Sequence, residues 1–517
     1  MNKINSLVLG ACFTVALISY PAYSLERGGV LSLAVNSSVK TLDPHKVVGA
    51  DSYHATFHLF STLTRIDENL NAQPELATDW SHEGKAINWT FHLNKNAKFS
   101  NGRDITAEDV KFSLNRVLDR KQSPRGYTRV GPIKEIIVLD KNTVKIILTK
   151  SYLELPIDLG GVYPRIIAKE NINDINTKPI SSGPFILESW TPGGVTTLVK
   201  NPYYYLNGED GKALPYVDKF KIVPIKENTS QLAALQSGAV QMMYRINYDL
   251  ISTAKKDESL VLVGGATPGY QPFILNLKPI IKEGADKEKA EIFNNEKLRE
   301  AISYMIHREA IINIALSGYG TVANDQPVPP FHPYFNHDIK PKKQNIKLAK
   351  KLLKEAGIKE GTHFTLYTST GRAGMSESAT AFQQMAKQAG LNIDIKLVDI
   401  ATYWTDIDFK VPFMTGNWGG RATISASIKP FYHSDGSSNE SHINNPELDR
   451  LLDEAEGESN IDIRKAKYAQ AQKIISDSNV TIIPYFKDAY AVVTKKVHNA
   501  KHHPLTYWYV DKLWLSH

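Results

Sequence analysis

Histidine is the residue type whose spacing most directly suggests metal chemistry. His54 and His58 stand four residues apart inside residues 54–63, where the apolar spacing predicts a helix, so both rings could face one metal ion. No acidic residue lies between them in the metalloprotease pattern. His332 and His337 lie in a proline-rich loop. The alternative is that His58 packs in the core while His54 lines a surface or a cleft.

Aromatic side chains are a second group with a chemical use. Phe, Trp and Tyr make up 9% of the chain, and Tyr403, Trp404 and Trp418 fall in loop-like contexts near glycine rather than on apolar stripes. Aromatic walls with a few placed charges are typical of pockets for small ligands. The alternative for each of these residues is an ordinary half-buried aromatic.

Sequence motifs of catalysis are missing. The chain has no Gly-x-Ser-x-Gly nucleophile elbow, no Walker A loop, and no Gly-x-Gly-x-x-Gly after a strand. The nearest glycine cluster, residues 208–212, has the wrong spacing to cradle a phosphate. Catalytic triads need not be adjacent in sequence, so a secreted hydrolase stays open as an alternative.

The N-terminal half contains the elements that must position these residues. Residues 30–35 read as a buried strand, and Pro44 ends the segment that follows. Residues 88–93 alternate at a period of two, which predicts another strand. Thr106 and Asp109 have the spacing of a capping box, so we expect a helix to start there.

The rest of the chain alternates helices with short strands, especially after about residue 293. That alternation indicates an α/β lobe. Further strands are predicted at residues 135–139, 143–148, 185–187, 364–368 and 393–397, and helices at 229–237, 297–316, 346–356 and 377–389.

Composition limits the class of protein. A chain of 517 residues suggests about two to four domains. With 42% hydrophobic and 22% charged residues it has the balance of a soluble globular protein. The formal net charge of +7 comes from scattered Lys and Arg residues, which makes nucleic acid an unexpected partner.

The first residues have the anatomy of a secretory signal peptide. Lys3 supplies a positive start, residues 7–20 are apolar, and residues 22–24 offer a small-x-small cleavage site, so residues 1–24 are predicted to be removed. Cys12, the only cysteine, follows a lipoprotein-like stretch. Lipid anchoring there is not expected, because only a short apolar stretch precedes it. The mature protein would then have no disulfide.

Six blocks, in order along the chain, resemble the extracellular solute-binding proteins of the peptide/nickel family, family 5 of ABC importers. One block alone would be weak, whereas six in order are specific. The blocks are residues 99–110; 182–185 with 201–204; 214–218 with 233–238; 298–302, after which the family usually has Asp where His307 stands; 445–449; and 468–472.

This resemblance implies an α/β, two-lobed periplasmic binding protein (class II, large cluster C type) with an extra inserted subdomain. The implied first lobe is discontinuous, at residues 26–55, 183–270 and 488–517, with the inserted subdomain at 56–182 and the second lobe at 271–487. It also implies a periplasmic, monomeric binding protein that is not an enzyme. Its partners would be a small-molecule ligand and ABC permease subunits in the inner membrane.

The resemblance also implies pocket residues. The loop of residues 416–421, with Asn417, Trp418 and Arg421, looks like members that bind nickel chelates or opine-type metallophores, because residues 422–425 lack the acidic group usual in peptide binders. An arginine fork suits a ligand carboxylate. The further residues implied are Arg165, as a second carboxylate-binding arginine, Tyr127, as a stacking aromatic, and Tyr403.

Several alternatives stay open for function and for Arg421. A di- or oligopeptide is the second ligand class, and a chaperone or haem carrier is a third function. No cofactor is expected, except a metal as part of a bound chelate. Arg421 could instead form a structural salt bridge within its loop.

Overall fold

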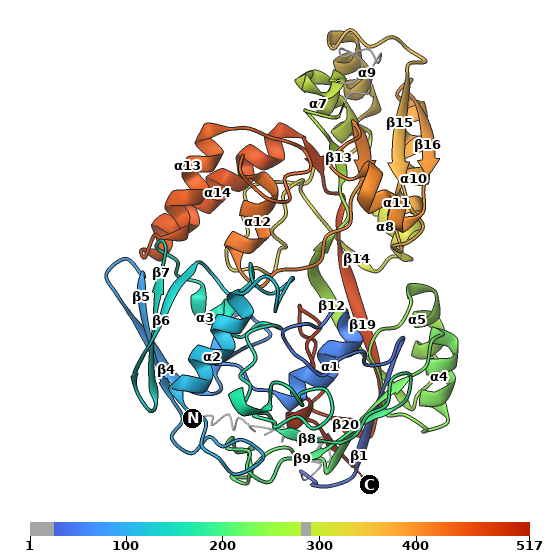
Figure 1. The fold of residues 1–517 in the computed structure, drawn as a ribbon. Helices are drawn as coiled ribbons and strands as arrows, with labels where there is room; N and C mark the ends of the chain where they lie inside the picture. The colour runs from blue at the N-terminus through green and yellow to red at the C-terminus, as the bar shows by residue number, and fades with distance from the viewer. Residues whose placement is uncertain (1–24, 281–290, 517) are drawn as a thin grey trace, which may run out of the picture.

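Two lobes, one above the other in Figure 1, make up the computed structural model. It describes residues 25–280 and 291–516. The predicted signal peptide at residues 1–24, with Cys12, lies outside the described residues. Within the described ranges, no helix has both the length and the apolar character needed to span a bilayer.

The lower lobe is built on an eight-stranded mixed sheet. Its strand β1 (Val30–Val35) runs parallel to its neighbours and is buried over five of six residues, as its apolar run predicts. Helix α1 (Ala50–Leu59) packs against β8 and β9. In sheet order the strands are β12 (Leu260–Tyr270), β19 (Tyr485–Thr494), β11 (Met242–Met243), β1, β10 (Lys219–Pro224), β9 (Thr196–Lys200) and β8 (Phe185–Ser189), and β14 (Gly320–Val322) pairs with β19.

An antiparallel four-stranded sheet lies at the left of the lower lobe in Figure 1. Its order is β4 (Ala77–Glu83), β5 (Asn88–Leu93), β7 (Thr143–Leu148), β6 (Ile133–Asp140). Helix α2 (Ala107–Leu118) covers it, and Val110 and Leu114 on this helix join the buried cluster of the sheet. The predicted capping box is confirmed, because the Asp109 carboxylate accepts from the Thr106 N–H at 2.9 Å.

The upper lobe contains a five-stranded sheet with helices around it. Its order is β16 (Asn392–Leu397), β15 (His363–Thr368), β17 (Phe413–Thr415), β13 (Phe273–Leu275), β18 (Thr481–Ile482). Its helices are α7 (Glu296–Met305), α8 (Arg308–Leu316), α9 (Ile346–Glu355), α10 (Met375–Gln388), α12 (Ile424–Tyr432), α13 (Pro446–Glu456) and α14 (Ile461–Ser478).

Short elements complete the described part of the chain. They are α3 (Leu155–Asp158), α4 (Asn228–Gln236), α5 (Tyr248–Lys255), α11 (Ile400–Thr402), β2 (Thr64–Ile66), β3 (Ala72–Pro74), β20 (Val497–His498), β21 (Trp514–Leu515), and the helical turns η1 (Lys169–Asn171), η2 (Ile292–Asn294), η3 (Tyr403–Ile407) and η4 (Val510–Lys512).

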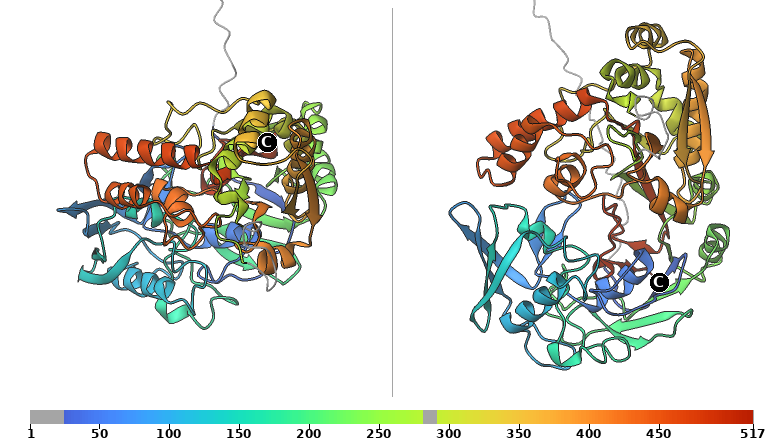
Figure 2. Two further views of the ribbon diagram at one scale, coloured as in Figure 1. Left: turned by 90° about the horizontal axis from the view of Figure 1, so that it is seen from above. Right: turned by 45° about the horizontal axis from the view of Figure 1, so that its top comes forward.

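Two stretches of chain connect the lobes. Strand β12 of the lower sheet continues into β13 of the upper sheet, and β18 of the upper sheet leads back into β19. Strands β12 and β19 pair with each other along most of their length, so the connection is a two-stranded ribbon. Figures 1 and 2 show the lobes facing each other on one side of this ribbon. The residue bounds that the family resemblance implies for the two lobes and the inserted subdomain stay a prediction.

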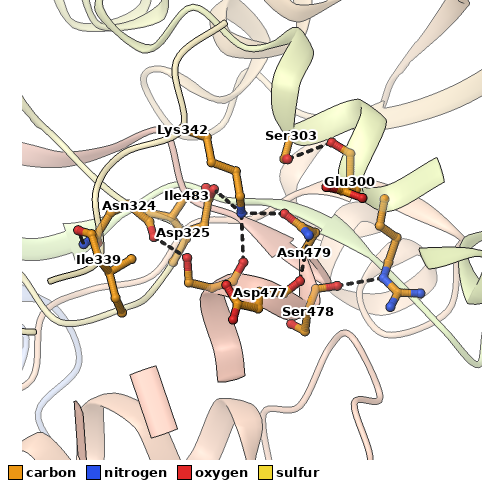
Figure 3. Close-up of polar contacts among 12 residues, drawn as sticks. Glu300, Ser303, Asn324, Asp325, Ile339, Lys342, Asp477, Ser478, Asn479 and Ile483 are labelled. Carbon is orange, nitrogen blue, oxygen red and sulfur yellow. Dashed lines mark hydrogen bonds and ion pairs between the residues drawn. The ribbon is translucent and has the colours of Figure 1, made fainter. Parts of the chain in front are cut away.

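A buried charge cluster stabilises the chain where the connection between β18 and β19 begins. Asp325 is fully buried, and its carboxylate accepts from the Arg308 guanidinium at 2.8 Å and from the Ile483 N–H at 3.0 Å. The Lys342 ammonium lies between this carboxylate, at 3.4 Å, and the Asn479 side-chain oxygen, at 2.7 Å (Figure 3). Both charges of Asp325 and Arg308 are compensated, so we assign this cluster to stability.

Three sequence predictions about elements are wrong in part. The helix expected over residues 297–316 is two helices, α7 and α8, because the backbone is extended at Ile306 and His307. The His307 ring caps α8 by accepting from the Ala310 N–H at 3.2 Å. The segment around Tyr403 is not a loop but a helical turn that continues α11. The helix expected over residues 54–63 begins and ends earlier, at Ala50 and Leu59.

Candidate ligand-binding cleft

Two adjoining cavities lie between the lobes. One, of about 790 Å³, extends to the ribbon and includes Lys487 of β19 in its wall; we call it the hinge cavity. The other, of about 680 Å³, includes Arg421 in its wall; we call it the rim cavity. Because five residues line both, the cavities form one continuous cleft. The shared residues are Arg129, Val162, Gly420, Leu505 and Tyr507.

Each cavity takes its walls from both lobes. In the hinge cavity, Tyr53 and Arg245 come from the lower lobe, and Arg372 and Asn417 come from the upper lobe. In the rim cavity, Tyr163 comes from the lower lobe and Arg421 comes from the upper lobe. Both cavities together are large enough for a small organic molecule and place aromatic rings beside charged groups.

Arg421 lies in the wall of the rim cavity. Its guanidinium donates to the carbonyls of Gly419 and Gly420, at 3.3 and 3.2 Å, and no described carboxylate lies within 4.0 Å of it. Burial, and next the charge of Arg129, lower the pKa of Arg421 to about 10. In the part of the chain that the structure describes, this arginine therefore has no salt bridge. Its contact with a ligand stays a prediction.

Asn417 lies in the wall of the hinge cavity, and its contact with a ligand stays a prediction. Its side-chain oxygen accepts from the Lys487 ammonium at 2.7 Å and from the Gln271 amide at 3.1 Å. These two donors fix the orientation of the amide. Asn417 therefore connects the upper-lobe loop to the ribbon.

Trp418 and Tyr403 lie outside both cavities. The Trp418 indole donates to Glu440 at 2.9 Å and its ring packs edge-on against Phe431, at 4.3 Å between centroids. Tyr403 is fully buried, and its hydroxyl donates to the Thr415 carbonyl. The structure places Tyr403 in the core of the upper lobe, so the expectation of a pocket aromatic is corrected here: its apolar neighbours bury the ring.

Arg165 is buried behind the cleft rather than in its wall. Its guanidinium donates to the Phe60 carbonyl at 2.9 Å and stacks over the Phe57 ring at 3.8 Å. One of its terminal nitrogens, Nη2, has no hydrogen-bond partner among the described residues. Phe57 itself lines the hinge cavity. Arg165 thus supports a cavity-lining ring, and neither cavity includes its own side chain.

Tyr127 is half-buried and also lies outside both cavities. The Arg120 guanidinium lies 5.6 Å from its ring centroid. Two residues further along, Arg129 lines both cavities. The stacking role expected for Tyr127 stays a prediction, and the nearby side chain that the structure places in the cleft is the cation Arg129.

The two histidines of α1 do not form a metal site. The His58 ring donates from Nδ1 to the His54 carbonyl at 2.6 Å and accepts at Nε2 from the Val510 N–H at 3.2 Å, so both nitrogens are used. Burial lowers the pKa of His54 to about 3 and that of His58 to about 4. Among the described residues no group of three or more His, Cys, Asp or Glu could hold a metal ion. His58 packs in the core, and His54 lines the hinge cavity.

Sequence reasoning missed most of the charged groups of the cleft. Besides Arg421, four cations line the two cavities without a described carboxylate within 4.0 Å: Arg129, Arg245, Arg372 and Lys487. They come from four separate segments with no common motif, so no local signal marks them. The acidic residues of the hinge cavity, also missed, are Asp249, Glu377 and Asp488.

Comparisons with known proteins agree with this architecture. The glutathione-binding protein GsiB of Salmonella choleraesuis is 26% identical over 406 residues, which are 78% of this chain and 75% of GsiB. The structure of the periplasmic binding protein DppA from Helicobacter pylori, in complex with the peptide STSA, covers 95% of this chain and 98% of its own, with 24% identity and a TM-score of 0.75.

A third similar protein is NikA from Staphylococcus aureus, in complex with Ni(L-His)2. It covers 95% of this chain and 100% of its own, with 21% identity and a TM-score of 0.72. At such identities these structures support the fold, which is that of a two-lobed binding protein.

A family model matches residues 71–439, more than half of the chain; it describes the bacterial extracellular solute-binding proteins, family 5. Proteins of this family bind small ligands or peptides, work with ABC permeases, are periplasmic or extracellular, and are transport proteins rather than enzymes. The match confirms the resemblance drawn from the six sequence blocks. This chain belongs to the bacterial extracellular solute-binding proteins of family 5.

Proposed function

We propose that this protein captures a small carboxylate-bearing ligand, of the metal-chelate or opine-metallophore type, between its lobes for delivery to its permease. The observation that carries the proposal is the pair Arg421 and Arg129 in the rim cavity, because neither guanidinium has a described carboxylate partner within 4.0 Å. A ligand carboxylate would supply the missing counter-charge and accept two parallel hydrogen bonds.

The positions of the two arginines suit a protein that captures its ligand by closing the two lobes around it. Arg129 belongs to the lower lobe and Arg421 to the upper lobe, and the charge of Arg129 already lowers the pKa of Arg421. Two cations on facing lobes repel each other in the absence of an anion. A carboxylate bound between the two guanidinium groups attracts both of them and offsets their mutual repulsion. A ligand drives closure only when it makes better contacts in the closed state than in the open state.

A peptide is the second candidate ligand, and one observation favours it. Asp488 lines the hinge cavity without a cation within 4.0 Å, and burial raises its pKa. A carboxylate in that position could pair with a peptide amine while the arginines bind the C-terminal carboxylate. The printed names of GsiB and DppA refer to glutathione and to a peptide, whereas that of NikA refers to a nickel–histidine complex.

Calorimetry separates these candidates. We expect Ni(L-His)2 or an opine metallophore to bind more tightly than dipeptides or the peptide STSA, and Arg421→Ala to weaken the best probe at least tenfold, which corresponds to about 1.4 kcal/mol. Lys396→Met, an exposed cation of β16 outside both cavities, is the matched control. Unchanged affinity in Arg421→Ala would contradict the proposal. Mass spectrometry of a ligand retained through purification would identify the natural ligand directly.

A further inference from the structure

Three cations meet at the end of the hinge cavity nearest the ribbon. Lys487 comes from β19, Arg245 from the segment after β11, and Arg372 from the segment before α10. None of the three has a carboxylate within 4.0 Å among the described residues. Within residues 25–280 and 291–516, Arg372 donates only to the neighbouring Gly371 carbonyl, and Arg245 lies against the Tyr244 ring.

Lys487 is the most enclosed of the three. Its ammonium donates one hydrogen bond, to the Asn417 side-chain oxygen at 2.7 Å. An ammonium has three N–H groups, and no described residue accepts from the other two. Burial, followed by the charges of Arg245 and Arg372, lowers the pKa of Lys487 to about 7. Arg245 and Arg372 are exposed and Lys487 is half-buried, so three like-charged groups lie close together at the surface of the cavity, and an anion would compensate their repulsion.

Nearby acidic groups do not neutralise this cluster. The Glu377 carboxylate accepts from the Gly374 N–H at 3.1 Å and the Ser376 hydroxyl at 2.9 Å. The Asp488 carboxylate accepts from the hydroxyls of Tyr490 and Thr321. The other titratable groups in the wall of the hinge cavity are Tyr53, His54, Arg129, Tyr244, Tyr248, Asp249 and Tyr507.

We propose that Lys487, Arg245 and Arg372 form a second anion subsite, so that the ligand carries two separated acidic groups. One acidic group would lie at this subsite and the other between Arg129 and Arg421. The inference rests on the proposed function and deepens it, because it names a ligand with two carboxylates rather than one. The continuity of the two cavities gives such a ligand room to span both cation groups.

Proton uptake is a consequence of this arrangement. Above pH 7 the Lys487 amine of the ligand-free protein is largely neutral. An anion beside it favours the charged form, so an acidic ligand that binds there at pH 8 takes up a proton. Affinity for that ligand should fall as the pH rises from 7 to 9.

The first test uses sulfate as the probe on the full chain. Lysines are labelled by reductive 13C-methylation, Lys487 is assigned with Lys487→Arg, and its titration is followed by NMR with and without 50 mM sodium sulfate at constant ionic strength. We expect sulfate to raise the midpoint by at least one pH unit, a tenfold gain in proton affinity, and to do so much less in the double variant Arg245→Ala, Arg372→Ala. An unchanged midpoint in the wild type overturns the subsite.

The second test determines whether the protein binds both carboxylates of one ligand. Calorimetry at pH 8 compares glutathione, which has two carboxylates, with the glutathione derivative whose glycine carboxylate is an amide and which therefore has one. Measurements in buffers of different ionisation enthalpy report the proton uptake. We expect at least tenfold weaker binding of the glycinamide, a similar loss for glutathione in Lys487→Met, and retention of affinity without proton uptake in Lys487→Arg. Equal binding of both compounds overturns the two-carboxylate ligand.

Failure of this inference differs from failure of the proposed function. If Arg421→Ala weakens binding while Lys487→Met leaves it unchanged, capture by carboxylate stands and the second subsite is wrong. If Arg421→Ala has no effect, the proposed function itself is wrong. Lys396→Met serves as the control cation for both experiments.

Discussion

Arginine is the residue type whose surroundings decide its role in this protein. Arg421 and Arg165 look alike in the sequence, yet Arg421 lines the rim cavity and Arg165 is buried behind the Phe57 ring. Arg65 is a third case, because its guanidinium lies 2.8 Å from the Asp511 carboxylate and 3.0 Å from that of Glu75. Only the arginine that lacks a carboxylate and faces the cleft is suited to an acidic ligand.

The variant Tyr403→Phe tests whether this tyrosine belongs to the core of the upper lobe rather than to the ligand pocket. Its hydroxyl donates to the buried Thr415 carbonyl, and the variant leaves that acceptor without its partner. We expect the unfolding free energy of the protein to fall by about 1–2 kcal/mol with unchanged ligand affinity. Chemical denaturation and calorimetry measure the two quantities.

The exposed neighbour Trp404 offers a control for that experiment. Trp404→Phe on the same helical turn should alter neither stability nor affinity by much, since the indole is 38% exposed. A loss of affinity in Tyr403→Phe without a loss of stability would return the tyrosine to the binding site.

At the scale of elements, one contact joins the lobes on the side opposite the ribbon. The segment between β7 and α3 carries Glu154, whose buried carboxylate accepts from the backbone N–H groups of Ile424 and Ser425, at 3.2 and 3.1 Å, at the start of α12. Arg464 of α14 lies 3.2 Å from the same carboxylate. A carboxylate at a helix N-terminus is favoured by the helix dipole, so the contact stabilises the lobes in this arrangement.

Lys150 and Ser151 extend this contact. The Lys150 ammonium donates to the buried Glu456 carboxylate at the end of α13, at 2.5 Å, and the Ser151 hydroxyl donates to the Gly457 carbonyl at 3.3 Å. A side chain at Gly457 would collide with Ser151, because an added Cβ would lie 2.6 Å from it. The lower and upper lobes therefore meet at a close, polar interface.

Glu154→Gln should open the cleft. The variant keeps the shape of the side chain but leaves Arg464 buried without its counter-charge, and breaking one side of a buried pair costs about 3–5 kcal/mol. We expect a larger radius of gyration by small-angle X-ray scattering in the absence of ligand, and weaker ligand binding. The exposed carboxylate of Glu135 on β6 provides the matched variant Glu135→Gln. Identical scattering for both variants would contradict a role in closure.

At the scale of the whole molecule, buried titratable groups couple folding to pH with opposite signs. Burial lowers the pKa values of His45 and His332 to about 4, below the value near 6.5 of an unfolded chain. Between pH 4 and 6.5 the unfolded chain binds more protons at these sites, so they contribute stability that is lost as the pH falls. Burial raises the pKa of Asp158 to about 8, which has the opposite effect between pH 4 and 8.

His45→Gln isolates one of these contributions. The His45 ring accepts from Arg116 at 2.7 Å and donates to the Arg165 carbonyl at 2.9 Å, two roles that a glutamine amide can partly fill. We expect the unfolding free energy to change less steeply from pH 6.5 to 4.5 than in the wild type, by up to about 1.4 kcal/mol per pH unit. Denaturant titrations over this range measure the slope. His363→Gln, at an exposed histidine, should leave the slope unchanged, and a parallel shift in His45→Gln would contradict the assignment.

Local sequence patterns predicted helices and strands well where a single apolar face or a single capping residue determines the element. The buried strand at residues 30–35 and the helix that begins after Thr106 follow from short patterns of apolar residues and from a cap three residues away. The break between α7 and α8 was missed because residues 297–316 keep helical spacing of apolar side chains across it. An extended backbone at Ile306 and His307 separates the two helices, so that α7 packs against α9 and α8 packs against α10.

The sequence by itself determined the family, the α/β class and most elements, because their patterns repeat over a few residues and six blocks stand in a fixed order. Only the tertiary structure decided which side chains line the cleft between the lobes. Arg129, Arg245, Arg372, Arg421 and Lys487 come from separate segments, and they meet because two lobes fold against one ribbon. The same packing buries Tyr403. Exposure to a cleft depends on contacts between distant segments, which no local spacing of residues records.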